Sequence, residues 1–248
     1  APRPQGPRPV ASGPGTGYVW PMIETFPDAD ALAEAATLAV QAALARTLAT
    51  GARASLVATG GRSPGPVYDR LSGLDELDWA RVDVTLSDER FVPASDPASN
   101  EGLVRGRLLT GPARAARFIP LMRRGAADAA ESARQAEAEV AALCPFDMTL
   151  LGMGPDGHVA SLIPGAQGLD AAMSSPAFCH GFNTPIGDPP RPRITLTLQA
   201  LMQSKAVRVL IAGAEKRAVA RAAAEGADLP VRALLTQTRL PVRVLWTP

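Results

Sequence analysis

Short apolar runs that alternate with helical segments constrain the fold of this chain more than any other feature. The apolar runs predict strands at about residues 19–26, 55–59, 82–86, 118–122, 146–151, 194–198, 206–212 and 242–246. The segments between them predict helices at about 28–51, 64–71, 100–109, 128–143 and 215–225. Parallel strands need crossover segments of this kind. The alternation therefore predicts an α/β fold with a doubly wound, mostly parallel Rossmann-like sheet and helices on both faces.

The length and composition of the chain fit one globular unit with a short tail. We expect residues 18–248 to form a single α/β domain, because that length can bury a sizeable core. Residues 1–17 are rich in proline and glycine and have almost nothing apolar to bury. We therefore expect a disordered tail there. The stretch 165–191 also lacks a regular pattern and is expected to be a loop.

Charge and cysteine content exclude several classes of partner. The formal net charge is +1, which gives no strong attraction to nucleic acid or to an anionic membrane. No apolar run approaches the ~18 residues of a membrane helix, and no signal peptide is visible. Cys144 and Cys179 lack metal-ligand spacing, so we expect two small core residues in a reduced, cytoplasmic compartment and no bound metal.

The most informative loop follows the strand expected at 146–151. Gly152, Gly154 and Gly157 let the backbone turn and approach a ligand closely, and His158 comes directly after them, where we expect the next helix to start. Exposed N–H groups beside an imidazole are suited to binding an anion and moving a proton. Two alternatives are a tight turn without a ligand and a dinucleotide site. Pro155 and the lack of an acidic residue about 20 positions on argue against the dinucleotide.

A second glycine loop follows the strand expected at 55–59. It reads Thr59-Gly60-Gly61-Arg62-Ser63, and a helix is expected after it. Freed N–H groups, flanking hydroxyls and the positive end of a helix dipole make a plausible phosphate cradle. The loop lacks the ending of a Walker motif. An ordinary turn between a strand and a helix is the alternative.

Charged side chains follow other expected strands. Asp88 and Arg90 lie in the sequence Ser-Asp-Glu-Arg after the strand at 82–86, where ligands bind in open α/β sheets. Arg193 precedes the strand at 194–198 and can pair with an anion or lie on the surface. Lys216 falls in the first turn of a helix, where a cation opposes the dipole, and this suggests an anionic partner. His180 has apolar neighbours and is expected to be packed rather than catalytic.

Four motifs in this order resemble those of the 6-phosphogluconolactonase family. They are TGGRSP at 59–64, SDERFVP at 87–93 with a later Ser-Asn, GMGPDGHVASLIPG at 152–165, and PRITLT at 192–197. The resemblance extends over roughly 23–246. It implies a Rossmann-like fold and the cofactor-free and metal-free hydrolysis of 6-phospho-D-glucono-1,5-lactone to 6-phosphogluconate in the pentose phosphate pathway. The partner is then a small phosphosugar lactone, and the protein is expected to be a monomer or a weak homo-oligomer.

This resemblance assigns expected roles to the residues of the motifs. His158 acts as base and then acid, a role that an imidazole pKa near 6.5 suits, and Asp156 orients its ring. Backbone N–H groups near Gly154 and Gly157, or the side chain of Arg90, stabilise the oxyanion. Asp88 and Asn100 orient loops or sugar hydroxyls, and Arg90 contacts either the phosphate or the lactone. The phosphate is assigned to Thr59, Gly60, Gly61, Ser63, Arg193 and Lys216.

Two other functions stay open at this point. Glucosamine-6-phosphate deaminases share the fold, but they carry an aromatic residue where this chain has Arg90 and an asparagine–glutamate pair at Leu162-Ile163. A non-catalytic phosphosugar-binding regulator would keep the glycines of the Thr59 loop and would have no need of His158. The presence of Asp156 and His158 favours an enzyme.

Overall fold

The computed structural model describes residues 23–248, and its centre is a parallel sheet. The sheet has seven strands in the order β1-β10-β9-β6-β2-β3-β5. All neighbouring pairs are parallel. This confirms the predicted doubly wound α/β fold. The strand bounds are β1 Ile23–Thr25, β2 Ala54–Ala58, β3 Val82–Leu86, β5 Arg117–Phe118, β6 Met148–Gly152, β9 Val207–Ala212 and β10 Val242–Thr247.

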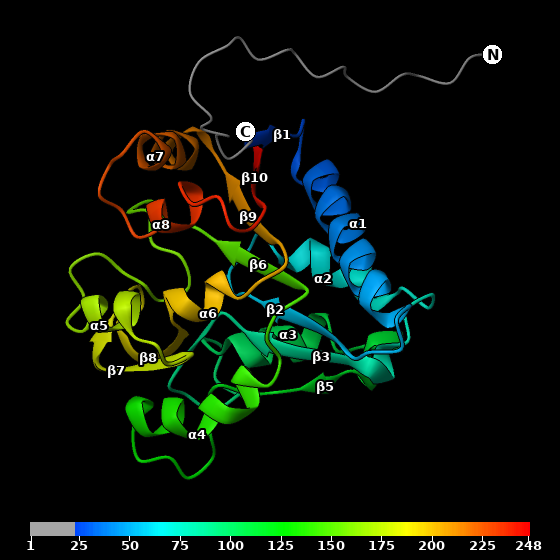
Figure 1. The fold of residues 1–248 in the computed structure, drawn as a ribbon, viewed down its shortest axis with the longest axis horizontal. Helices are drawn as coiled ribbons and strands as arrows, with labels where there is room; N and C mark the ends of the chain where they lie inside the picture. Colours follow the sequence, from blue (N-terminus) through cyan, green and yellow to red (C-terminus); the bar gives the residue numbers. More distant parts are fainter. Residues whose placement is uncertain (1–22) are drawn as a thin grey trace.

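Helices flank the sheet, with α1 on its right and α7 and α8 on its left in Figure 1. Asp28 caps α1, and its Oδ1 accepts the N–H of Ala31 at 2.8 Å. One face of α1 is buried along its whole length, from Leu32 to Leu48, where apolar residues recur every four positions. The bounds are α1 Ala29–Leu48, α2 Gly65–Ser72, α3 Asn100–Arg107, α4 Ala129–Ala141, α5 Leu169–Ser174, α6 Leu198–Met202, α7 Ala214–Ala224 and α8 Arg232–Leu235, with 3-10 turns at Trp79–Arg81 and Gly111–Ala115.

A second, antiparallel sheet was not predicted from the sequence. It has the order β4-β8-β7, with β4 at Asp88–Arg90, β8 at Arg191–Leu196 and β7 at Cys179–Ile186. The expectation of a loop over 165–191 is therefore wrong, because this stretch contains both α5 and β7. The sequence of β7 includes glycine, asparagine and proline, which are poor strand formers, so packing decides its structure. A Cβ on Gly181 would overlap the backbone of Ala129, so glycine lets β7 lie directly against the start of α4.

The helix expected to begin at His158 is also absent. The chain makes a turn there instead: the N–H of Gly154 donates to the carbonyl of His158 at 2.9 Å, and Gly157 has a φ of +75°. Ala160, with a φ of +50°, carries the backbone further from a helical path. The expected tail at 1–17, and the start of the first expected strand at residue 19, lie outside the described residues.

Candidate active site

A cavity of about 500 Å³ lies at the carboxyl ends of β2, β3, β6 and β9. Ligands bind at this edge of open α/β sheets. The structure brings most of the predicted site residues together here. Asp156 and Gly157 belong to the same loop as His158 but do not line the cavity. The lining residues are Thr59, Gly60, Gly61, Arg62, Ser63, Pro64, Asp88, Arg90, Asn100, Gly152, Met153, Gly154, Pro155, His158, Ala160, Asp188, Arg193, Leu210 and Lys216.

A buried tyrosine fixes the backbone at the start of the loop after β2. The hydroxyl of Tyr68, on α2, donates to the carbonyl of Thr59 at 2.6 Å and accepts the N–H of Thr59 at 2.8 Å. The hydroxyls of Thr59 and Ser87 are hydrogen-bonded, with 3.0 Å between their oxygens; Thr59 donates, because the single Ser87 proton goes to Asp88. Gly61 has a φ of +97°, a conformation that favours glycine. No side chain caps the N-terminus of α2, so its positive end faces the loop uncapped.

Asn100 connects this loop to the loop after β3. Its Nδ2 donates to the carbonyl of Asp88 at 2.8 Å, and its Oδ1 accepts a hydrogen bond from Nη1 of Arg90 at 2.9 Å. A Cβ on Gly60 would overlap that amide, so glycine allows the two loops to touch. Nη1 of Arg90 also donates to the carbonyl of Ala98 at 2.6 Å. Nε of Arg90 is buried and has no hydrogen-bond partner among residues 23–248. Nη2 also has no partner there and is not among the fully buried atoms, so it is the nitrogen of Arg90 that a ligand can reach.

Asp88 is a buried carboxylate at the inner end of the cavity. It accepts the hydroxyls of Ser87 at 2.9 Å and Ser161 at 2.6 Å. Nη1 of Arg193 lies 3.8 Å from its Oδ2. These partners satisfy a charge that would otherwise be costly to bury.

Arg193 is engaged mainly with the backbone around it. It is 4% exposed, and its Nε donates to the carbonyl of Ile186 at 3.0 Å. Its Nη2 donates to the carbonyl of Pro189 at 3.3 Å. Burial lowers the pKa of this guanidinium, and the charge of Asp88 opposes that shift. Arg193 therefore holds the turn that brings Asp188 to the cavity, and only Nη1 faces another side chain.

His158 and Asp156 form a hydrogen-bonded pair at the mouth of the cavity. Nδ1 of His158 lies 2.6 Å from Oδ1 of Asp156, and the backbone N–H of His158 donates to the same oxygen at 3.2 Å. When Nδ1 carries the proton, the lone pair of Nε2 is free. The side chains are 31% and 43% exposed, so water can reach the ring. A Cβ on Gly154 would overlap the imidazole, which explains the need for glycine at that position.

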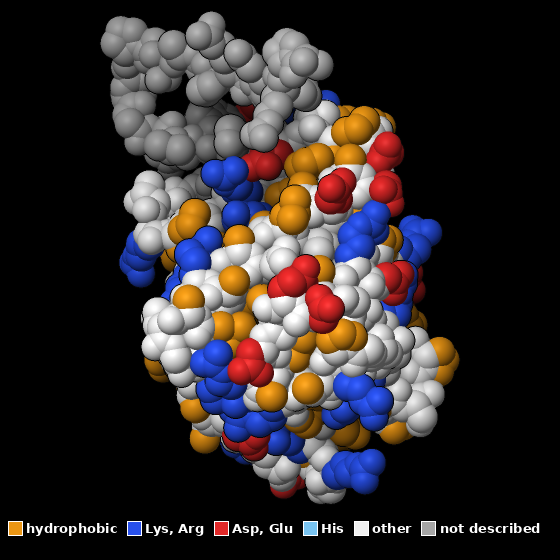
Figure 2. Space-filling model, turned by 90° about the vertical axis from the view of Figure 1, so that its right-hand side faces the viewer, with side chains coloured by type: hydrophobic (Ala, Val, Ile, Leu, Met, Phe, Trp, Pro, Cys, Tyr) orange, Lys and Arg blue, Asp and Glu red, His pale blue; other side chains and the backbone are white. Residues whose placement is uncertain are grey.

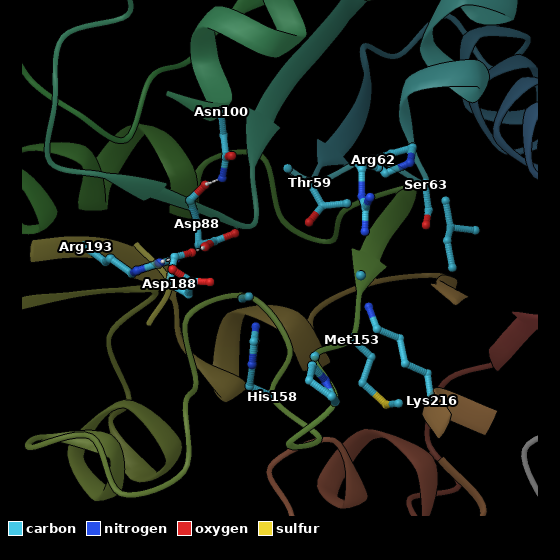
Figure 3. A pocket seen from close by; sticks show the side chains of 18 of the residues that line it. Thr59, Arg62, Ser63, Asp88, Asn100, Met153, His158, Asp188, Arg193 and Lys216 are labelled. Carbon is cyan, nitrogen blue, oxygen red and sulfur yellow. Dashed lines mark hydrogen bonds and ion pairs between the residues drawn. The ribbon is translucent and has the colours of Figure 1, made fainter. Parts of the chain in front are cut away.

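The charges in the cavity are separated. In Figure 3, Arg62, Ser63 and Lys216 lie on one side of His158, while Asp88, Asp188 and Arg193 lie on the other. Burial lowers the pKa of the Lys216 ammonium, and the charge of Arg62 lowers it further. Two cations held close together in a partly buried position favour an anion between them.

Sequence reasoning missed several lining residues. Arg62 lies inside the TGGRSP motif, so its place in the loop was a signal that could have identified it. Asp188 lies in a turn whose position depends on the second sheet, and no local pattern marks it. His180 does not line the cavity, and its ring packs edge-on against Phe182, with 4.8 Å between ring centroids.

The described residues hold neither a metal-ligand cluster nor a helix able to cross a membrane. Within 23–248, no group of three or more histidine, cysteine, aspartate or glutamate side chains is arranged to hold a metal ion. In the same part of the chain, no helix has the length and apolar character needed to cross a membrane.

Similarities in sequence and in fold point to the same family of proteins. The model of the family described as glucosamine-6-phosphate isomerases/6-phosphogluconolactonase matches residues 27–246. A 6-phosphogluconolactonase of Caulobacter vibrioides is 45% identical over 228 residues, which are 90% of this chain and 96% of the relative. One from Mesorhizobium japonicum is 40% identical over 94% of this chain and 97% of its own length. The crystal structure of a 6-phosphogluconolactonase from Shewanella baltica superposes with a TM-score of 0.87 at 34% identity, covering 94% of this chain and all of that one.

Proposed function

This chain belongs to the family of glucosamine-6-phosphate isomerases and 6-phosphogluconolactonases, and we propose that it hydrolyses 6-phospho-D-glucono-1,5-lactone to 6-phosphogluconate. One observation carries the proposal: a single cavity holds a cationic loop on one side and a histidine–carboxylate pair beside it. A phosphosugar lactone has the matching features, a dianion at one end and an ester carbonyl at the other. The reaction is the lactone-opening step of the pentose phosphate pathway.

His158 supplies the acid–base chemistry in this proposal. Its Nε2 removes a proton from a water molecule as the water oxygen attacks the lactone carbonyl carbon. The tetrahedral intermediate then expels the ring oxygen, and the imidazolium returns the proton to it, so that an alcohol and a carboxylic acid form. Asp156 holds the ring through Nδ1 and stabilises the imidazolium between the two steps. No covalent intermediate is required.

Arg90 is the group best placed to stabilise the oxyanion. The N–H groups of Gly154 and Gly157, which were the alternative, are both engaged inside the turn, with the carbonyls of His158 at 2.9 Å and Gly154 at 3.1 Å. Arg90 lines the cavity, and its Nη2 has no hydrogen-bond partner within 23–248 and is not among the fully buried atoms. A fixed donor aimed at the position where negative charge develops stabilises that charge strongly. We therefore assign Arg90 to the lactone end.

The phosphate is assigned to the loop after β2 and to Lys216. Thr59, Gly60, Gly61 and Ser63 supply hydroxyl and N–H groups, and Arg62 joins Lys216 as a second cation. We leave Arg193 out of the phosphate site, because it lies on the side of His158 opposite Lys216 (Figure 3) and its Nε and Nη2 are bound to carbonyls. Asp88 and Asn100 fix the loops. Binding the remote dianion positions the carbonyl, where a displacement of about 1 Å can cost roughly a hundredfold in rate.

The proposal includes three further features. No metal ion or cofactor takes part, the protein acts in the cytoplasm, and it functions as a monomer or a weak homo-oligomer. The absence of a metal is supported by the lack of a ligand cluster within 23–248.

A substrate comparison tests the function against the deaminase and regulator alternatives. The initial rate of hydrolysis of freshly generated 6-phosphogluconolactone is measured at neutral pH, with the enzyme-free rate subtracted. The same protein is then assayed with glucosamine 6-phosphate and with unphosphorylated gluconolactone. We expect rapid hydrolysis of the phosphorylated lactone, weak hydrolysis of the unphosphorylated one and no ammonia release. Deamination, or binding of 6-phosphogluconate without lactone turnover, would contradict the proposal.

A further inference from the structure

Glu89 is a buried carboxylate beside the cavity that the proposed chemistry does not use. It lies in the middle of β4, between two lining residues, and is 0% exposed. Its two oxygens accept four hydrogen bonds. The donors are the backbone N–H of Arg90 at 2.7 Å, the hydroxyl of Ser99 at 2.9 Å, the N–H of Asn100 at 2.7 Å and the N–H of Glu101 at 2.6 Å.

Three of these partners are backbone N–H groups, which can only donate, and the fourth is a hydroxyl. An ionised carboxylate satisfies all four as donors, whereas a protonated one requires the Ser99 hydroxyl to turn and accept. Asn100 and Glu101 are the first two residues of α3, so the charge also lies at the positive end of that helix. Burial raises the pKa of Glu89 to about 7, and the four donated hydrogen bonds oppose the rise. A buried charge is costly, and this one has no salt-bridge partner within the described residues.

The carboxylate joins the two ends of one loop. Arg90 ends β4, Asn100 begins α3, and residues 91–99 connect them, so Glu89 fixes both ends through their backbone N–H groups. The side chains of the same two residues are bonded to each other, with Arg90 Nη1 2.9 Å from Asn100 Oδ1. Asn100 in turn fills the space against Gly60 in the phosphate loop. One buried group thus sets the separation between the lactone end and the phosphate end.

We infer that Glu89 is a positioning residue for lactone hydrolysis, holding Arg90 and Asn100 so that the free Nη2 of Arg90 faces the reacting carbonyl. The inference rests on the proposed function. Glu89 does not line the cavity, so it acts through Arg90 and Asn100. Because Asn100 is itself bonded to the Arg90 side chain, the effect of Glu89 on kcat/KM should depend on that side chain. The effect of Glu89 on the free energy of unfolding should not.

A double-mutant cycle tests this dependence. Glu89→Gln keeps the shape of the side chain but places an amide group against N–H donors. We measure kcat/KM for the phosphorylated lactone in the wild type, Glu89→Gln, Arg90→Ala and the double variant, each corrected for its folded fraction. We expect Glu89→Gln to lose at least ~10-fold in the wild-type background and less than ~3-fold in the Arg90→Ala background, since coupled residues are not additive. Glu89→Asp keeps the charge on a shorter side chain. It replaces Glu89→Gln in the cycle if the amide variant does not fold.

Glu101→Gln is the matched control. It removes a carboxylate from the first turn of α3, where the Glu101 side chain pairs with Arg105 at 2.7 Å and makes no hydrogen bond to Arg90 or Asn100. It should keep kcat/KM within ~2-fold, because an i,i+4 pair on one helix contributes little and neither residue lines the cavity. Equal losses from Glu89→Gln with and without Arg90, or no loss at all, would overturn the inference while the wild type still hydrolyses the lactone. A wild type without lactone turnover would instead refute the proposed function and this inference together.

Discussion

Asp156 Oδ1 lies 2.6 Å from Nδ1 of His158 and also accepts the backbone N–H of the same residue. One carboxylate oxygen thus fixes both the ring and the turn that carries it. The arrangement depends on glycine at position 154, where a Cβ would overlap the imidazole. The geometry leaves Nε2 as the ring atom that can act on a water molecule.

We expect Asp156→Asn to lower kcat about 10- to 100-fold with little change in KM, the loss seen when a group that orients a functional histidine is removed. An amide nitrogen at this position can face Nδ1 and favour the wrong tautomer. Steady-state kinetics with background subtraction measure the effect. A rise in KM at unchanged kcat would show that Asp156 serves binding rather than orientation.

Gly60→Ala should reduce kcat/KM by at least ~10-fold, because the new methyl group would displace the Asn100 side chain and with it Arg90. Gly61→Ala is the control in the same loop. No atom lies within 4 Å of its Cβ position, so its cost comes from backbone strain alone. Asn100→Ala removes the same contact, so the double variant should lose no more activity than Asn100→Ala alone; additive losses would contradict the steric explanation.

Phosphosugar affinity should fall at alkaline pH through Lys216. Its pKa in the folded protein is below the ordinary lysine value, because of burial and the charge of Arg62. The ammonium is present below that lowered pKa and is lost as the pH rises through it. Calorimetric titration with 6-phosphogluconate from about pH 7 to about pH 10 should therefore show weakening below the pH at which free lysine titrates. Lys216→Arg should bind with a flatter profile; an equally steep decline in that variant would exclude Lys216 as the cause.

Dialysis against a chelator should leave lactone hydrolysis unchanged, because within residues 23–248 the structure shows no cluster able to hold a metal ion. The dialysed protein is assayed with and without added divalent cations. Activity that disappears on dialysis and returns with one cation would require a metal in the mechanism.

The parallel sheet was predictable because its signals are local. Continuous apolar runs such as 82–86 and 206–212 identify buried strands, and the polar residues after them were expected at one edge of the sheet. The structure places them there, and Thr59, Asp88 and Lys216 all line one cavity.

The second sheet was not predictable because its signals are not local. β7 is a strand through its packing on α4, where Gly181 lies against Ala129, and its own residues favour a loop. Asp188 and the partners of Arg193 depend on this sheet, so the turn that brings them to the cavity stayed hidden. The turn at His158 was mistaken for a helix start because glycines before a helix and glycines inside a turn look alike in sequence.

The most direct test of the account is the turnover of His158→Ala on freshly generated 6-phosphogluconolactone at neutral pH, measured together with its Kd for 6-phosphogluconate. The account predicts a loss of at least ~100-fold in kcat, the scale of general acid–base catalysis, and a Kd within ~3-fold of the wild type. Unchanged turnover in this variant would contradict the assignment of the imidazole as the proton-transfer group, and with it the mechanism built around the cavity.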